Sequence, residues 1–327
     1  MNSSQLSQTW LLLGKRLQRE EVSSLTSAQQ AAVGRLVTYT CERTSSMTRL
    51  NWAGVFQGCA CLDLGEMQDS ILKSFSLWLS KSKSGPKRKG RFQGEDSDAR
   101  SISNIIYSIA RVKMDVPLTV WMDLLDSVDE ACPRANTQDI SNIMWALGRL
   151  DILPSQRVFQ TLEWRICNIA DELPPRVIAM IFWSYARMDI TPHPLVLERL
   201  NGRVMNKEVC FNSVDVANIY WAHGKLALDL TSGLERRLET SLLRALPEMK
   251  LKEVINVLWA YAQRAESPSK STLGEIESRI RSLVNTNLDK RSKQSALKAI
   301  LSAYNGFQGA APTDILQGFQ APSTERK

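Results

Sequence analysis

The sequence contains few of the residues that metal centres and acid–base catalysis require. Its 327 residues include two histidines and six cysteines, and no two cysteines have the C-x-x-C spacing. Closely spaced Cys and His ligands are typical of structural zinc sites, so their scarcity argues against one. Scattered single cysteines are typical of helical cores, and we expect free thiols in a reducing compartment. We expect His223 to pack in the core and His193, which lies between two prolines, to be exposed.

The sequence also lacks the patterns of membrane spans and of common enzymes. No apolar run approaches the ~18 residues that a membrane-spanning helix needs. The motifs G-x-x-x-x-G-K-S/T, G-x-G-x-x-G, H-E-x-x-H and G-x-S-x-G do not occur. We therefore expect a folded protein without membrane insertion, which is not an enzyme and uses no metal and no cofactor.

What the sequence does contain is a repeat. An aromatic residue recurs every 38 residues, at Tyr107, Trp145, Trp183, Trp221 and Trp259. The five copies that it marks, 98–135, 136–173, 174–211, 212–249 and 250–287, follow one another without an insertion. Self-similarity at a constant period of this length is typical of helical-repeat arrays.

The residues around the aromatic, which we number as position 0, recur with it. Apolar residues at −5 and −2 and a small residue at +3 predict a deeply buried helix that crosses its neighbour closely. A loop and a second apolar series, at +17 and +21, predict a second helix. The predicted fold class is all-α, a right-handed α-solenoid of stacked two-helix repeats. We expect the aromatic to pack in the core against the next repeat rather than to stack on bases.

The repeat pattern decays on both sides of the five copies. Residues 1–97 are predicted to hold degenerate helical repeats with a basic insertion at 81–97, and residues 288–327 one capping helix and a polar tail. Residues 1–19 contain no acid and an amphipathic stretch. Two interpretations of this segment stay open: a degenerate first repeat, or an organelle-targeting segment.

Polar residues recur on one side of the first helix. Position −3 carries an Asn ladder, formed by Asn104, Asn142, Asn218 and Asn256, with Met180 in the third copy. Position +4 carries a basic ladder, formed by Arg111, Arg149, Arg187 and Lys225, with Gln263 in the fifth copy. Position −7 adds Arg100, Arg176 and Lys252, together with Gln138. Asn can hydrogen-bond a base edge, and Arg can bind phosphate or stack on a base, so these ladders are our candidate RNA-binding residues.

A structural interpretation of the same ladders stays open. An Asn inside a helix can fix the packing of the adjacent repeat, and an exposed Arg can be an ion-pair partner. The net charges of residues 1–97, 98–287 and 288–327 are +5, −1 and +3. Attraction to phosphate therefore has to come from one side of the array or from its flanks.

The basic insertion is the strongest candidate in the flanks. Lys81, Lys83, Lys87, Arg88, Lys89 and Arg91 lie close together beside Gly and Pro. Such a segment would add phosphate affinity that weakens with salt, and it is also similar to a nuclear-import signal; a solvated loop is the remaining alternative. We include Lys87, Arg88 and Lys89 among the RNA-binding candidates.

The repeat resembles a known family. A 38-residue helix pair with the phrases "SNIMWALGRLDILP" and "VANIYWAHGKLALDL" is similar to the octotricopeptide-repeat family and, more distantly, to the helical repeats of the Fas-activated-kinase-like proteins. The resemblance covers about 60% of the chain. It implies sequence-selective binding of single-stranded RNA, with roughly one nucleotide per repeat, in RNA processing, stability or translation.

The resemblance also sets expectations for location and partners. It favours the chloroplast or the mitochondrion, with the nucleus or cytoplasm as alternatives. The RAP domain that ends many relatives has no match here, so RNA cleavage is not expected. Because five repeats would read few bases, we expect protein partners in a ribonucleoprotein complex or a longer gene product. The alternative function is a helical-repeat scaffold that binds proteins without contacting RNA.

Overall fold

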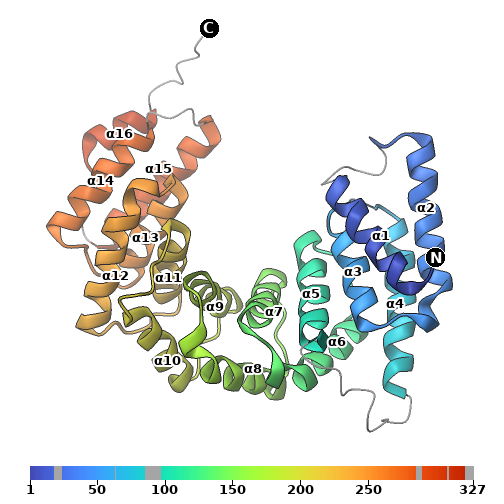
Figure 1. Ribbon diagram of the computed structural model, residues 1–327. Coiled ribbons are helices and arrows are strands. Elements are labelled where there is room, and N and C mark those ends of the chain that lie inside the picture. Colours follow the sequence, from blue (N-terminus) through green and yellow to red (C-terminus); the bar gives the residue numbers. More distant parts are fainter. Residues whose placement is uncertain (18–23, 63, 85–96, 285–288, 308, 321–327) are drawn as a thin grey trace. The chain divides into compact units, whose positions relative to one another are not determined.

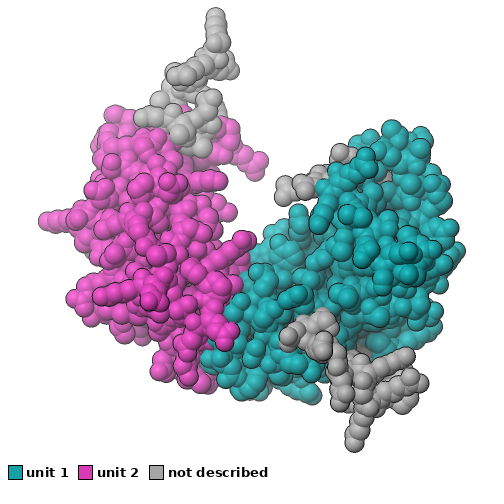
Figure 2. Space-filling view, viewed as in Figure 1, with its two compact units in different colours: residues 1–169 teal, residues 170–327 magenta. Residues whose placement is uncertain are grey.

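A computed structural model describes residues 1–17, 24–62, 64–84, 97–284, 289–307 and 309–320 (Figure 1). These residues form sixteen α-helices, α1 to α16, with short 3-10 segments, and they include no β-strand. The chain divides into two compact units, residues 1–169 and 170–327, coloured separately in Figure 2. The prediction of an all-α fold is confirmed.

The first unit consists of four helix pairs in two layers. Its helices are α1 (Ser3–Arg16), α2 (Ser27–Glu42), α3 (Arg49–Cys59), α4 (Met67–Ser84), α5 (Ser97–Val112), α6 (Leu118–Ala131), α7 (Thr137–Leu150) and α8 (Gln156–Asn168). The odd-numbered helices pack side by side in chain order and form the first-helix layer. The even-numbered helices contact one another in the same order and form the second-helix layer.

The second unit repeats this arrangement. Its helices are α9 (Pro175–Met188), α10 (Pro194–Met205), α11 (Ser213–Lys225), α12 (Ser232–Ala245), α13 (Leu251–Gln263), α14 (Lys270–Val284), α15 (Lys290–Gly306) and α16 (Thr313–Gln320). Helices α9, α11, α13 and α15 form its first-helix layer, and α10, α12, α14 and α16 its second-helix layer. Each unit is thus a stack of helix pairs, which confirms the predicted solenoid packing within the units.

The flanking segments add helix pairs at both ends of the sequence. Leu6 and Trp10 of α1 are fully buried, and α1 packs on α3, which favours the degenerate-repeat interpretation of this stretch. After residue 288 the structure has two helices where we predicted one, because Ile315 and Phe319 give the short helix α16 a buried face. Residues 321–327, at the end of the predicted polar tail, lie outside the described residues.

The turn that ends each first helix is the same in all five copies. Position +6 adopts the left-handed conformation, with φ between 47° and 57°, in Lys113, Asp151, Asp189, Ala227 and Ala265. The next N–H bonds the carbonyl five residues earlier, as from Leu228 to His223 at 3.0 Å. This is a helix-terminating Schellman-type turn. It returns the chain toward the second helix at the same point in every copy, which keeps the period constant.

The small residue at +3 lies at a close helix crossing, as predicted. A Cβ on Gly224 of α11 would lie 2.6 Å from the Cα of Ala260 and 2.9 Å from its Cβ. Backbone of α13 therefore occupies the space that a side chain would need. Close packing of this kind holds successive first helices in a fixed register, so residues at one repeat position form a ladder within each unit.

Candidate functional site

The candidate residues of the five copies lie along one face of each first helix. Positions −7, −3, 0 and +4, which we call the polar stripe, are three or four residues apart and therefore share a helix face. The −7 side chains Arg100, Arg176 and Lys252 are exposed near the start of their helices. The +4 side chains Arg111, Arg187 and Lys225 are exposed near the end. None of the five copies has a carboxylate at any of these four positions.

The Asn ladder has a structural role in the first unit. Asn142 is buried; its Nδ2 donates to Asn104 Oδ1 of the preceding repeat at 3.5 Å, and its Oδ1 accepts from Gln138 at 2.8 Å. The 3.5 Å contact is at the limit of a hydrogen bond. The amide of Asn142 is therefore occupied by its neighbours, as the structural interpretation predicts.

In the second unit the side chains of the Asn ladder are not hydrogen-bonded to neighbouring side chains within the described residues. Asn218 and Asn256 are half-buried, and within the described residues neither makes a side-chain hydrogen bond. Met180 holds position −3 in the copy that begins this unit and has no amide to offer. Asn218 and Asn256 therefore keep the donors and acceptors that base recognition requires.

Two members of the basic ladder bind the end of the preceding first helix. Arg149 Nε donates to the Ala110 carbonyl at 2.9 Å, and Lys225 Nζ lies 2.8 Å from Asp189 Oδ1. A helix C-terminus leaves carbonyls unpaired and favours positive charge. The Lys225–Asp189 pair is largely exposed, so its contribution to stability is small, about 0–1 kcal/mol. Arg149 is thus a structural residue, whereas Lys225 keeps an exposed ammonium group.

The aromatic residues are not in the core, contrary to our prediction. All five are half-buried, and the fully buried tryptophans are instead Trp10 and Trp52. The rings do contact the next repeat: Tyr107 and Trp145 have centroids 4.8 Å apart, and Trp221 and Trp259 have centroids 6.3 Å apart. Position 0 lies at the edge of the apolar arc, where packing covers one side of the ring and leaves the other on the polar stripe.

Two guanidinium groups lie over these rings. The Arg149 guanidinium is 5.2 Å from the Trp145 ring centroid, and that of Arg187 is 6.0 Å from the Trp183 ring centroid. Both distances are within the range of cation–π attraction. The polar stripe therefore combines cations and aromatic faces, which is the surface chemistry that single-stranded nucleic acids bind.

A second recurring series of arginines was not predicted from the sequence. Position +20 carries Arg165, Arg203 and Arg279, half-buried in the second-helix layer. Arg165 Nε donates to the Ala135 carbonyl at 2.7 Å, and Arg279 donates to the Met249 carbonyl through Nε at 3.0 Å and Nη2 at 2.7 Å. Each carbonyl is at −10 of the same repeat, just before the first helix. Recurrence at +20 was the available signal, and these arginines stabilise the fold rather than bind a ligand.

Ionisable groups with shifted pKa values lie in the core beside the stripe. Burial lowers the pKa of His223 to about 4, and the Arg264 guanidinium acts in the same direction. The His223 ring packs on Phe182 with centroids 4.9 Å apart, so the predicted core position is confirmed. Burial raises the pKa of Asp215, while the Asn212 N–H and Arg176 oppose that shift. His193 is exposed, as predicted, and its Nδ1 accepts from the Leu195 N–H.

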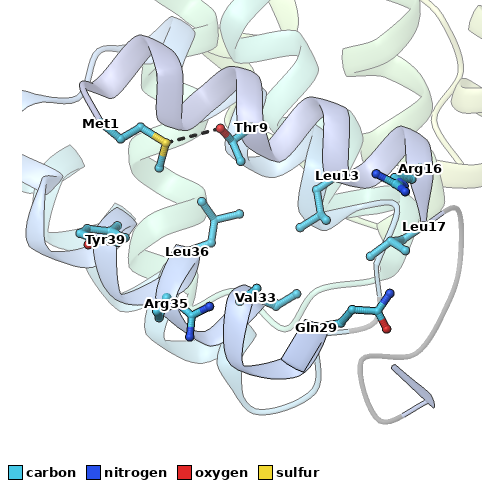
Figure 3. Close-up of a pocket in the computed structure, with 11 residues that line it drawn as sticks. Met1, Thr9, Leu13, Arg16, Leu17, Gln29, Val33, Arg35, Leu36 and Tyr39 are labelled. Carbon is cyan, nitrogen blue, oxygen red and sulfur yellow. Dashed lines mark hydrogen bonds between the residues drawn. The ribbon is translucent and has the colours of Figure 1, made fainter. Parts of the chain in front are cut away.

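An apolar pocket of about 450 Å³ lies between α1 and α2 (Figure 3). Leu13 from α1 and Leu17, which directly follows α1, face Val33, Leu36 and Tyr39 from α2 across it. Its polar lining includes two arginines of the same helices, Arg16 and Arg35. No residue of the polar stripe lines this pocket.

The cysteines, the possible metal ligands, the helix lengths and the basic insertion can be compared with the sequence predictions. All six cysteines are free thiols, and burial raises the pKa of Cys132 to about 12. The described residues hold no group of His, Cys, Asp and Glu side chains suited to a metal ion. None of the described helices is both long and apolar enough to cross a membrane. Lys81 and Lys83 belong to the last turns of α4, whereas Lys87, Arg88, Lys89 and Arg91 lie outside the described residues.

Comparisons with known proteins give low similarity. No protein-family profile matches the chain, and no curated protein matches it. An engineered protein of known structure is 12% identical over 98% of this chain and 94% of its own, with a TM-score of 0.24. A designed armadillo-repeat protein in complex with the peptide (KR)4 is 14% identical over 79% of this chain and 98% of its own, also with a TM-score of 0.24. Likeness this low identifies neither a family nor a ligand, and the chain's own contacts make it an α-helical-repeat protein.

Proposed function

We propose that this helical-repeat protein binds single-stranded RNA on the polar stripe of its first-helix layers and has no catalytic role. The observation that carries the proposal is the charge of the exposed ends of the stripe. Six cations are exposed there: Arg100, Arg111, Arg176, Arg187, Lys225 and Lys252. No carboxylate shares the stripe, although residues 98–287 have a net charge of −1. In each unit, the cations of the stripe attract phosphate to the exposed face of the first helices.

The chemistry of the stripe fits a single strand better than a duplex. Exposed Lys and Arg side chains bind phosphates, and half-exposed rings between them offer faces for unstacked bases. If about four phosphates of a single strand are neutralised, the affinity falls about 50-fold between 50 and 200 mM salt. Steep salt dependence is therefore the first property to measure.

The structure changes which residues we assign to base recognition. Asn104 and Asn142 bond each other, and Arg149 bonds a helix end, so we assign these three to packing. Asn218 and Asn256 are the candidates for hydrogen bonds to base edges. The resemblance to the octotricopeptide repeat supports RNA as the ligand, and on it rests our proposal of a role in RNA processing, stability or translation in the chloroplast or mitochondrion.

Two matched triple variants test the proposal. The first, Arg176→Gln with Arg187→Gln and Lys252→Gln, removes three exposed cations from the stripe. The control, Arg199→Gln with Arg236→Gln and Lys270→Gln, removes three exposed cations from the second-helix layer of the same unit. Both have the same change in net charge. We expect the first to lower the affinity for a random 16-nucleotide RNA pool at least ten-fold more than the control, as measured by fluorescence anisotropy at 100 mM salt.

The remaining outcomes are also informative. Equal losses in the two triples would show that only net charge matters and would refute the stripe as the interface. No salt-dependent binding of the wild-type protein to the pool would refute RNA binding itself. The alternative, a scaffold that binds proteins through the same layers, would then replace our proposal.

A further inference from the structure

The rings of Trp221 and Trp259 form a pair that differs from the other ring contact of the polar stripe. They lie on α11 and α13, which pack side by side, with centroids 6.3 Å apart and planes inclined by 30°. Both rings are half-buried. Aromatic rings in contact have centroids about 4.5–7 Å apart, so this pair is in contact at the wide end of that range.

The pair in the first unit shows what a closed contact looks like. Tyr107 and Trp145 have centroids 4.8 Å apart, and the Arg149 guanidinium covers Trp145. Trp221 and Trp259 have no such cover within the described residues. The residue four after Trp221 is Lys225, which points to Asp189, and the residue four after Trp259 is the uncharged Gln263.

We propose that one base of a single-stranded RNA inserts between the indole rings of Trp221 and Trp259. The inference rests on the proposed function and adds the chemical group that this site binds. Stacking on both faces of a base needs ring planes about 7 Å apart, so the two indole side chains have to rotate apart and become parallel when the base enters.

The surroundings of the two rings suit a nucleotide. Lys252, two turns before Trp259, is exposed and can bind a flanking phosphate. Lys225, one turn after Trp221, is also exposed and can exchange its surface ion pair with Asp189 for a phosphate. Asn218 and Asn256 are three residues before the two rings and half-buried, within reach of a base edge on the same stripe. The indoles bind any base, while the amides add a preference among bases.

The experiment compares ligands and variants. The ligands are a random 16-nucleotide RNA pool and a 16-unit abasic ribose–phosphate oligomer, which has the same charge and no bases. The variants are Trp221→Leu and Trp259→Leu, with Trp164→Leu as the control, because Trp164 is an exposed tryptophan of α8 in the second-helix layer, away from the polar stripe. Trp221→Phe keeps a ring and tests whether stacking, rather than a changed fold, explains a loss. Circular dichroism and thermal unfolding establish that each variant is folded.

We expect the abasic oligomer to bind at least ten-fold more weakly than the pool. Trp221→Leu and Trp259→Leu should each lower pool affinity about 5- to 150-fold and leave abasic affinity unchanged. Trp164→Leu should bind both ligands like wild type. Trp221→Phe should recover most of the lost affinity.

Two other results separate the inference from the proposed function. The stacking site would be overturned, and RNA binding left intact, by either of two results. In the first, the abasic oligomer binds as tightly as the pool; in the second, all three Leu variants keep the salt-dependent binding of the pool. Loss of pool binding in Trp221→Phe equal to that in Trp221→Leu would also overturn it. Absence of pool binding in the wild-type protein would overturn the proposed function itself.

Discussion

The close crossing of α11 and α13 predicts opposite effects for one substitution at two glycines. In Gly224→Ala the new Cβ meets the Cα of Ala260 at 2.6 Å and its carbonyl oxygen at 3.0 Å. In Gly202→Ala, near the end of α10 in the same unit, the Cβ meets nothing within 4 Å. Both glycines are within three residues of a helix C-terminus, so the change in backbone freedom is similar.

The magnitudes follow from two terms. Replacing Gly by Ala in a helix stabilises by about 0.5–1 kcal/mol, and this applies at both sites. At Gly224 the clash is with backbone, which cannot rotate away, so α11 and α13 have to separate. Overpacking of this kind costs about 1–3 kcal/mol. The difference between the two variants isolates that cost.

Thermal unfolding monitored by circular dichroism, with urea titration as a second measure, tests this reasoning. Gly202→Ala should raise Tm slightly, and Gly224→Ala should have a Tm about 2–12 °C below that of Gly202→Ala. If Gly224→Ala stabilises the protein as much as Gly202→Ala does, the helices are not in the close contact that fixes the ladder register. The placement of Trp221 beside Trp259 would then lose its support as well.

Three further predictions concern stability. The pKa of His223 is about 4 in the folded protein against 6.5 unfolded. Between these pH values the unfolded chain therefore binds more protons than the folded protein. The free energy of unfolding should fall by up to roughly 3 kcal/mol as the pH drops from 6.5 to 4. Urea unfolding of His223→Leu should not show this dependence on pH. Ala227→Gly should raise stability by about 1 kcal/mol because Ala227 has φ 47°; an unchanged urea midpoint would contradict this. Arg279→Met should destabilise by about 1–3 kcal/mol, since the Met249 carbonyl loses its donor, whereas Arg236→Met at an exposed site should change the urea midpoint little.

The sequence predicted the helix pairs because the 38-residue period fixes them without reference to any distant contact. It did not predict how much of each aromatic ring is exposed. The sequence gives the face of the helix on which Trp145 lies, but not how much of its ring the neighbouring repeat covers. The partners of Asn142 and Arg149 lie 38 and 39 residues away and become visible only when the repeats are stacked. The turn at Ala227 carries no glycine, so composition gave no sign of its left-handed backbone.

The hydrogen bonds from the arginines at position +20 to backbone carbonyls also affect how the number of repeats can change. Arg165 reaches Ala135, Arg203 reaches Leu173 and Arg279 reaches Met249, each 30 residues back, which is less than one period. A segment of 38 residues that starts at the bonded carbonyl residue, or a few residues before it, therefore contains both the donor and the acceptor of that bond. Duplication or deletion of such a segment therefore adds or removes both partners of the hydrogen bond. No bonded carbonyl loses its arginine. Arrays of different length, with different numbers of ligand contacts, are then accessible to evolution and to protein engineering by whole-repeat steps.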